Sequence, residues 1–317
     1  YPKARDHALD AVKTRTEVDA QRAKLSTRQT LQPAYAALLD ALSAAALPFE
    51  QGLRKERELF LSLVPTTAAQ ALRYQFKVER EAGKLPPQWQ APTRPVSVVA
   101  VIGAGTMGSG IAIALLDAGL AVLLLEQDEA ALKRGRERIA RHYLDRVRAG
   151  KLAAEKAAAC EAQLTVSLDW TQLRNADLVI EAVFEDLVVK QDVFRQIDVH
   201  ARPGAVLATN TSYLDVDAIA AATSRPQDVL GLHFFSPANV MNLLEVVRGA
   251  KTAPDVLASG MALGSTLKKT PVLAGNAFGF IGNRIYNAYR WQCELMLEEG
   301  ATPRQVDAAL EAFGFAM

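Results

Sequence analysis

Short apolar runs alternate with helical stretches between Val96 and Gly275, and this alternation limits the fold more than any other feature of the sequence. The runs are VSVVAVI, AVLLLE, DLVIEAV, AVLATN and VLGLHF, and helical segments such as DLVVKQDVFRQIDVHA separate them. Strands that are joined through helices run parallel, and a parallel sheet is covered by helices on both faces. The pattern therefore predicts an α/β domain over residues 96–275, built on a doubly wound parallel sheet.

Helical segments flank this predicted domain. Residues 1–82 are rich in Ala, Leu, Arg and Glu without strand alternation, so we expect helices there. Four prolines in GKLPPQWQAPTRP predict a stiff linker over residues 83–95. Residues 276–317 return to helical patterns that end at glycines, which predicts an all-α C-terminal domain. The chain begins with Tyr1 and stops at AFGFAM without a polar tail, so we expect both ends to be cut from a longer polypeptide and the last domain to be truncated.

Composition excludes several classes of function. Lys and Arg number 36 against 35 Asp and Glu, so a net charge of +1 gives no global attraction to nucleic acid or to an anionic membrane. Cys160 and Cys293 form no CxxC motif, which argues against a disulfide scaffold or a structural zinc site and indicates a reducing compartment. The apolar stretches IAIALL and AVLLL are shorter than the ~18 residues of a membrane span. We therefore expect no metal, no nucleic-acid partner and no membrane span.

The segment VIGAGTMGSG places Gly103, Gly105 and Gly108 in GxGxxG spacing between the first strand and a helix. The first glycine permits a tight turn, the second lets backbone amides approach a pyrophosphate, and the third lets the helix pack against the strand. Glu126 ends the second strand, near the usual offset of ~20 residues, and a carboxylate there accepts the ribose hydroxyls of NAD and repels the extra phosphate of NADP. The motif predicts a Rossmann-type, NAD-binding domain. A glycine turn that serves packing alone is the alternative.

The segment LGLHFFSPANVMNLLEVV places a histidine at the end of one apolar strand and a glutamate on the next. A lone histidine at a strand end more often packs, or lies at a hydrogen-bonded rim, than takes part in chemistry. Here His233 reaches the carboxyl edge of the predicted sheet, where open α/β folds bind ligands, and Glu245 returns to the same place. A carboxylate partner holds the imidazole in one tautomer and makes it a better proton acceptor.

Other polar residues are predicted near this histidine. The strand AVLATN ends at Asn210, with Ser212 close behind, and Asn283 begins the helical segment after the sheet. When an alcohol is oxidised, hydride leaves the carbinol carbon and the hydroxyl proton passes to a base. His233 fits the base, Ser212 fits a group that holds the oxygen, and Asn283 fits a neutral donor from a second domain. A satisfied polar cluster at a domain junction is the alternative.

Five separated motifs, VIGAGTMGSGIA, NTSYL, GLHFFSPANVMNLLEVV, GFIGNRIYNAY and FGFAM, resemble the 3-hydroxyacyl-CoA dehydrogenase family in the form fused into multifunctional fatty-acid oxidation enzymes. The resemblance covers residues 96–317. It implies that His233 is the catalytic base, that Glu245 is its partner, and that Ser212 and Asn283 contact the substrate oxygen. Single-domain members usually read HFFNP and NTSS, so Ser236 and Tyr213 here fit the fused branch and leave the cofactor contacts near Ser236 open.

The resemblance also extends the predicted cofactor site. It implies that Glu185 lies near the nicotinamide and Lys190 near the cofactor or the CoA tail, although both also fit ordinary charges at a helix entry. The predicted NAD-binding residues are Gly103, Gly105, Thr106, Met107, Gly108, Glu126, Glu185, Lys190 and Asn210.

The first 82 residues resemble another part of the same fusion enzymes. LPFEQGLRKERELFLSL and ALRYQFKVEREAGKLP resemble the last helices of the enoyl-CoA hydratase/isomerase domain and its connector. The hydratase core is absent, so we expect no hydratase activity from this chain, while the parent protein is expected to be a lyase and isomerase as well. Contacts with that missing domain or with a thiolase partner are implied.

The resemblance implies NAD-dependent oxidation of (S)-3-hydroxyacyl-CoA to 3-oxoacyl-CoA in fatty-acid β-oxidation, in the cytoplasm or, in a eukaryote, in peroxisomes. Two alternatives stay open: a non-catalytic dinucleotide-binding scaffold, and a dehydrogenase of the same fold that acts on a sugar acid. The basic stretch LKRGRERIARHYLDRVRAGK favours CoA if it meets the CoA phosphates, but such a run of charges is more often a solvated helix face.

Overall fold

The computed structural model of the chain describes residues 8–315, the side chain of Arg28 excepted. The chain divides into two compact units. We call residues 1–81 the helical unit and residues 82–317 the sheet unit. Neither contains, within the described residues, a helix that is both long and apolar enough to cross a membrane.

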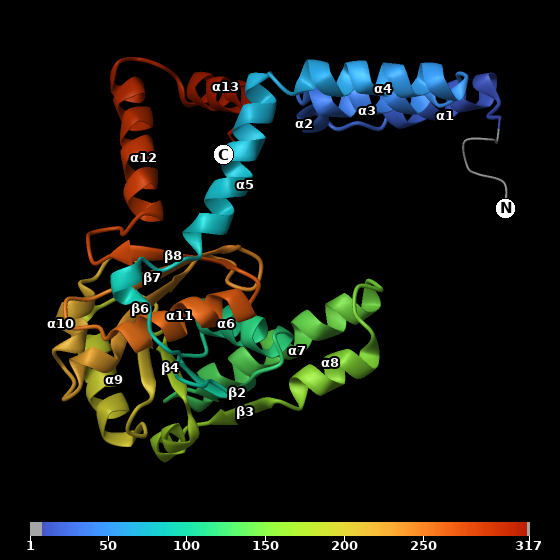
Figure 1. Cartoon of the computed structure of the whole chain (residues 1–317). Coiled ribbons are helices and arrows are strands. Elements are labelled where there is room, and N and C mark those ends of the chain that lie inside the picture. The colour runs from blue at the N-terminus through green and yellow to red at the C-terminus, as the bar shows by residue number, and fades with distance from the viewer. Residues whose placement is uncertain (1–7, 316–317) are drawn as a thin grey trace. The chain divides into compact units, whose positions relative to one another are not determined.

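The sheet unit is built around one eight-stranded sheet, in the order β3-β2-β1-β4-β5-β6-β7-β8 (Figure 1). Strands β1 to β6 run parallel to one another, which confirms the predicted doubly wound sheet. Strand β7 is antiparallel to β6, and β8 is parallel to β7. The reversal follows from the connection: residues 235–242 are too few for a helical crossover, so the chain returns as a hairpin. The strands are β1 (Val98–Ile102), β2 (Ala121–Leu125), β3 (Leu164–Ser167), β4 (Leu178–Glu181), β5 (Val206–Thr209), β6 (Val229–Phe234), β7 (Leu243–Arg248) and β8 (Thr270–Gly275).

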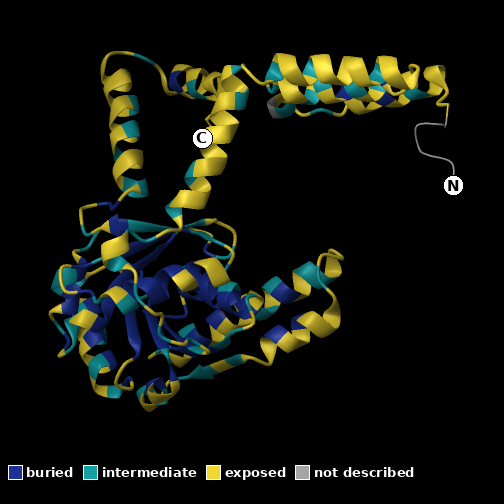
Figure 2. Cartoon of the chain, viewed as in Figure 1, coloured by how far each residue is buried: buried dark blue, intermediate teal, exposed yellow. Residues whose placement is uncertain are grey.

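Helices cover both faces of the sheet because successive strand residues point to opposite sides. Val99 and Val101 pack in one apolar cluster with α6, α7, α8 and α11, while Ala100 and Ile102 pack in another with α9 and α10. Buried residues are accordingly concentrated on the sheet and on the helix faces turned toward it (Figure 2). These helices are α6 (Thr106–Asp117), α7 (Glu129–Arg148), α8 (Ala154–Glu161), α9 (Leu187–His200), α10 (Val216–Ala220) and α11 (Pro254–Thr266), with short 3-10 turns at Pro87–Trp89, Trp170–Asn175 and Pro226–Asp228.

The segment predicted as a linker, residues 83–95, is bonded to the sheet unit. The backbone amide of Arg94 donates to Ser259 Oγ, and its guanidinium forms ion pairs of 2.8 Å with Asp228 and Asp255. At the other end of the unit, α12 (Gly282–Glu298) and α13 (Pro303–Phe313) form the predicted helical region. A capping box between Thr302 and Gln305 begins α13.

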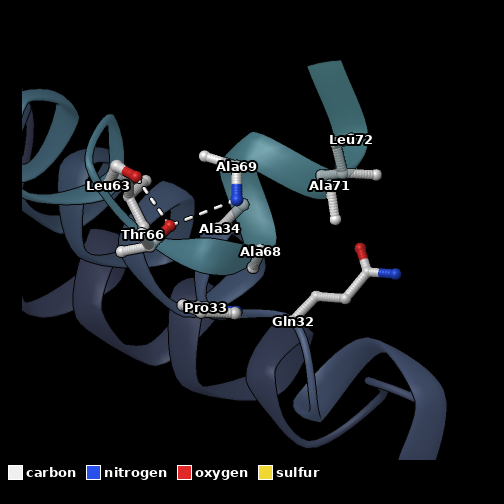
Figure 3. A pocket seen from close by; sticks show the side chains of 9 residues that line it. All are labelled: Gln32, Pro33, Ala34, Leu63, Thr66, Ala68, Ala69, Ala71 and Leu72. Carbon is white, nitrogen blue, oxygen red and sulfur yellow. Dashed lines mark hydrogen bonds between the residues drawn. The ribbon is translucent and has the colours of Figure 1, made fainter. Parts of the chain in front are cut away.

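The helical unit contains α1 (Ala11–Arg22), α2 (Thr27–Thr30), α3 (Pro33–Ala44), α4 (Phe49–Leu63) and α5 (Thr67–Ala82), whose last residue lies past the boundary. Helices α3 and α4 approach closely at Gly52, where an added Cβ would lie 2.7 Å from the Ala44 carbonyl oxygen. A largely apolar pocket of about 250 Å³ is lined by the start of α3, the end of α4 and the first turns of α5 (Figure 3). Thr66 caps α5, because its hydroxyl accepts a hydrogen bond from the Ala69 amide.

Candidate active site

The predicted histidine and glutamate face each other across two neighbouring strands. His233 on β6 and Glu245 on β7 are directly paired in the antiparallel register, so their side chains lie on the same face of the sheet. His233 Nδ1 is 2.6 Å from Glu245 Oε2, and the side chains are 4% and 0% exposed. The hairpin that reverses the sheet is therefore what brings the imidazole and the carboxylate together.

Glu245 is held by the start of α12 as well as by the histidine. Its Oε1 accepts hydrogen bonds from the backbone amides of Ile281 at 3.0 Å and Gly282 at 2.7 Å. Burial raises the pKa of Glu245, but the bonds from His233 and these amides outweigh burial and keep its pKa below the ordinary value. The helix N-terminus adds to this effect because its partial positive charge favours an anion. Glu245 is thus a buried, ionised partner for the imidazole.

The second nitrogen of His233 remains open for chemistry. Nε2 makes no hydrogen bond within the described part of the chain, since the hydrogen bond of this side chain is made through Nδ1. Aromatic rings border the imidazole, with the Phe235 and Phe280 centroids 4.4 and 5.6 Å away. With Nδ1 donating to Glu245, Nε2 is the atom that can accept a proton.

The predicted substrate-oxygen ligands approach the site from two different elements. Ser212 lies in the loop after β5, and Asn283 lies in the first turn of α12. The Asn283 side-chain amide donates to the Ser212 carbonyl oxygen at 3.4 Å. Gly282, the residue before Asn283, donates to Glu245. The first turn of α12 therefore connects the Ser212 loop to the His233–Glu245 pair.

Three charged side chains underlie the Ser212 loop. Glu185 Oε1 accepts from the Thr211 hydroxyl at 2.6 Å and the Ser212 amide at 2.7 Å, and the ammonium of Lys190 lies 3.3 Å from Glu185 Oε2. Lys190 also pairs with Glu181 at 2.6 Å. Burial raises the pKa of Glu185, yet the bonds from Thr211, Ser212 and Lys190 outweigh burial and hold its pKa below the ordinary value. The Lys190 side chain is 1% exposed, so the structure places it inside the protein, under Glu185.

Asn210, directly after β5, is bonded to β6 beside the His233–Glu245 pair. Its side-chain oxygen accepts from the backbone amide of Phe234, the neighbour of His233, at 2.9 Å. The predicted residues His233, Glu245, Asn283, Ser212, Glu185 and Lys190 thus belong to one continuous set of contacts, and Asn210 joins it through the backbone of β6.

The glycine turn follows β1, as predicted. Gly103 has φ +101°, and an added Cβ would lie 2.7 Å from the Ala182 carbonyl oxygen, so the turn passes close to the end of β4. At Gly108 an added Cβ would lie 1.8 Å from the Gly103 oxygen, which excludes any side chain there. Nothing lies within 4 Å of the Cβ position of Gly105, which leaves its outer side open to a ligand.

The start of α6 offers donors to such a ligand. The backbone amides of Thr106, Met107 and Gly108 donate to no acceptor within the described residues, since the first hydrogen bond of the helix is from Ser109 to Gly105. Glu126 lies beside the turn, where its Oε2 accepts from the Ala104 amide at 3.0 Å. Free amides at a helix N-terminus suit a pyrophosphate, and the glycines let it come close, so these residues fit a dinucleotide.

Sequence reasoning missed several residues that support the site. Glu181, Thr209 and Thr211 form the buried part of the network, with the Thr209 hydroxyl donating to Glu181 Oε2 at 2.7 Å. The available signal was a glutamate inside the apolar run DLVIEAV, because a charge in a buried strand needs partners. Phe280 contacts the His233 ring and has a positive φ of 45°. Nothing in the sequence indicates either feature.

Comparisons with known proteins support the resemblance to 3-hydroxyacyl-CoA dehydrogenases. Residues 98–277 match the 3-hydroxyacyl-CoA dehydrogenase NAD-binding domain, and residues 279–317 match its C-terminal domain. The peroxisomal bifunctional enzyme of Danio rerio is 45% identical over 287 residues, which cover 89% of this chain but 39% of that protein. The chain therefore spans less than half the length of that relative.

Solved structures agree with the sequence matches. The (S)-3-hydroxybutyryl-CoA dehydrogenase of Ralstonia eutropha is 33% identical with a TM-score of 0.67, covering 68% of this chain and 77% of that one. The 3-hydroxybutyryl-CoA dehydrogenase of Escherichia coli is 42% identical with a TM-score of 0.66, covering 68% of this chain and 46% of that one. Matched in profile, sequence and fold over most of its length, the chain belongs to the 3-hydroxyacyl-CoA dehydrogenase family.

Proposed function

We propose that this chain oxidises (S)-3-hydroxyacyl-CoA to 3-oxoacyl-CoA with NAD, as the dehydrogenase part of a multifunctional β-oxidation enzyme. The observation that carries the proposal is the His233–Glu245 pair, in which Nδ1 is engaged at 2.6 Å and Nε2 is left open. A scaffold without catalysis needs no such buried pair, whereas alcohol oxidation needs a base.

The residues of this chain divide the work of the reaction. NAD, when bound, supplies the acceptor for the hydride that leaves C3 of the substrate. Nε2 of His233 takes the hydroxyl proton, and the Glu245 carboxylate stabilises the imidazolium that results. The Ser212 hydroxyl and the Asn283 amide hold the substrate oxygen in line with Nε2. In the reverse direction the same imidazolium returns the proton to the oxygen.

The cofactor would be held at the mouth of α6. Thr106, Met107 and Gly108 offer free backbone amides to the pyrophosphate, and Gly105 leaves room for it. Glu126 retains lone pairs for ribose hydroxyls and would repel a 2′-phosphate, which favours NAD over NADP. Glu185 is the carboxylate nearest the Ser212 loop, and with Lys190 and Asn210 it completes the proposed nicotinamide side.

The acyl-CoA substrate is proposed from the relatives, because two proteins of similar structure are named 3-hydroxybutyryl-CoA dehydrogenases. The basic helix α7 is a candidate for the CoA phosphates, since Arg138 lies beside the glycine turn with its guanidinium 2.9 Å from Ser109 Oγ. By analogy with the fused relatives, the parent protein would add hydratase and isomerase activities and contact that domain or a thiolase. Its location would be peroxisomal in a eukaryote and cytoplasmic otherwise.

The test follows nicotinamide absorbance with acetoacetyl-CoA and NADH, using the wild-type chain and the His233→Gln variant. We expect His233→Gln to lower kcat by about 10²–10⁴-fold, the usual contribution of a general base, with the NADH Kd changed less than about 3-fold. His200→Gln, at the far end of α9, is the matched control and should keep wild-type rates.

Other outcomes separate the alternatives. Tight NADH binding without oxidation in the wild type would identify a scaffold and refute the proposal. Turnover that survives in His233→Gln would remove this residue from the base role. If free CoA failed to compete with the substrate, the hypothesis of a dehydrogenase that acts on a sugar acid would be favoured.

A further inference from the structure

The loop between β6 and β7, residues 235–242, is anchored where it crosses the sheet edge. It begins two residues after His233 and ends three residues before Glu245, so both catalytic partners are attached to it. Ala238 in this loop is 1% exposed and packs on α6 at Gly110, where an added Cβ would lie 3.2 Å from Ala238 Cβ. The loop therefore joins the strands of the catalytic pair to the helix that begins at the glycine turn.

Lys269 holds this loop from the side of β8. Its ammonium donates to the carbonyl oxygens of Ala238 at 2.6 Å and Met241 at 2.7 Å, and it lies 5.7 Å from the ring centroid of Phe234. The next residue, Thr270, adds a backbone bond of 2.7 Å to the carbonyl of Asn242, the last loop residue.

The surroundings of Lys269 are unusual for a lysine that serves solubility. Within the described residues no carboxylate lies within ion-pair distance of its ammonium, and both of its hydrogen bonds go to loop carbonyls. Burial lowers the pKa of this half-buried side chain. The two charge-assisted hydrogen bonds from this ammonium hold the Ala238 and Met241 carbonyls at one point.

We propose that Lys269 is a positioning residue for the dehydrogenation, and that it fixes His233 relative to the glycine turn by holding the β6–β7 loop on α6. The inference rests on the function proposed above. Within the described residues, Lys269 makes no hydrogen bond to His233 or Glu245. It acts through Ala238 and Met241, and a displacement of about 1 Å at a reacting group can lower a rate by about 10²-fold.

The first test replaces Lys269 by Met, which keeps the apolar stem and removes the donors. We expect kcat for acetoacetyl-CoA reduction to fall by about 10- to 100-fold, while the NADH Kd changes less than about 3-fold because the glycine turn is untouched. Amide hydrogen exchange at Val240 and Met241 should become at least about 10-fold faster. Lys269→Arg, which keeps a charge and several donors, should recover most of kcat.

The neighbouring lysine supplies a matched control. Lys268 is exposed and has a positive φ of 56°, a backbone strain that Lys and Met share, so Lys268→Met should keep wild-type kinetics and exchange. Gly110→Ala tests the contact between the loop and α6, because the added methyl group would press on Ala238. Alanine favours a helix over glycine, so a lower kcat without a lower Tm would mark displacement of the loop.

The outcomes are decisive in each direction. Wild-type kcat in Lys269→Met would overturn the inference. So would an Arg variant no better than Met, or a fall in kcat matched by equal losses in NADH affinity and Tm, which would indicate a merely structural residue. If the wild type reduced no acetoacetyl-CoA, the proposed function would fail by itself, and unchanged loop exchange in Lys269→Met would separately refute the holding role.

Discussion

Both units of the chain contain lysine–glutamate ion pairs, and two of these pairs lie in opposite surroundings. In the sheet unit, Lys190 and Glu181 are 2.6 Å apart, with side chains 1% and 0% exposed. On α4 of the helical unit, Lys55 and Glu58 are 3.6 Å apart, with side chains 51% and 69% exposed. Water surrounds the second pair and is excluded from the first, so only the buried charges depend on each other for solvation.

Apolar side chains show the same contrast. The strands of the sheet unit bury residues such as Leu124 and Leu230 completely. In the helical unit Val18, Leu39 and Ala44 are the buried hydrophobic residues among those described, while large side chains such as Phe60 and Leu61 are more than half exposed. Figure 2 shows this as a mostly exposed surface on these helices. Substitutions should therefore have large effects in the sheet unit and small ones in the helical unit.

Removing one charge of the buried pair should give the largest difference between the units. We expect Lys190→Met to destabilise the sheet unit by about 3–5 kcal/mol, because it leaves Glu181 buried without a counter-charge. Lys55→Met should change the stability of the helical unit by less than about 0.5 kcal/mol. Urea denaturation with amide hydrogen exchange measures each unit separately.

A double variant distinguishes lost pairing from lost packing. Lys190→Met combined with Glu181→Gln removes both charges, so it should recover much of the stability that Lys190→Met loses. Equal losses in the single and double variants would show that the Lys190 stem matters more than its charge, and the contrast between the units would then be one of packing alone.

Deleting a buried leucine should have the next largest effect. Leu124 on β2 is 0% exposed, and Leu124→Ala should cost about 2–5 kcal/mol because its neighbours cannot close the cavity. Leu61 on α4 is 52% exposed, and Leu61→Ala should cost about 1 kcal/mol or less. Thermal denaturation of both variants tests this, and a similar loss at Leu61 would mean that its helix face is covered in solution.

The same contrast explains which strands the sequence predicted. The central strands are buried on both faces and read as continuous apolar runs, so β1, β2, β4, β5, β6 and β7 were all recognisable. The edge strands β3 and β8 were missed. Leu164–Ser167 is short and none of its residues is fully buried, and Thr270–Gly275 contains a proline, which argues against a strand unless it lies at an edge.

The active-site residues were predicted from their positions relative to strands and helices along the chain, and the direction of β7 could not be predicted in this way. His233, Glu245, Ser212 and Asn283 follow recognisable segments, so their proximity could be expected from strand ends that share an edge. The reversal at β7 could not be read from periodicity, because an apolar run has no direction. Lys190 was expected near the cofactor, and its 1% exposure could not be predicted, because one sequence does not reveal that Glu181 on β4 and Glu185 in the loop after β4 both lie beside its ammonium.

Acid should affect the sheet unit through Glu245 and Glu185, a smaller effect than either substitution above. The pKa of each is held below its ordinary value, so both bind protons more readily after unfolding. Their contribution to stability is therefore complete above the ordinary glutamate pKa and is lost as pH falls through the lower folded values. Urea midpoints of the sheet unit, measured from about pH 6 to about pH 3, should fall at the acid end.

Glu245→Gln tests the assignment of this acid effect. Glutamine can still accept the amides of Ile281 and Gly282 but does not titrate, so the acid end of the profile should be shallower than in the wild type. Parallel profiles in the two proteins would place the acid sensitivity elsewhere in the unit.

The smallest effect is expected at the ion pair that joins α1 to α3. Arg22 Nη2 lies 2.7 Å from Asp40 Oδ1, but the side chains are 41% and 50% exposed. A double-mutant cycle with Arg22→Ala and Asp40→Ala should give a coupling of about 0.2–1 kcal/mol. Salt near 1 M, where the Debye length is about 3 Å, should remove most of it, whereas the coupling of Lys190 to Glu181 should persist. A large, salt-insensitive coupling at Arg22 would show that the helical unit also shields its charges from water, and the distinction between the two units would no longer hold.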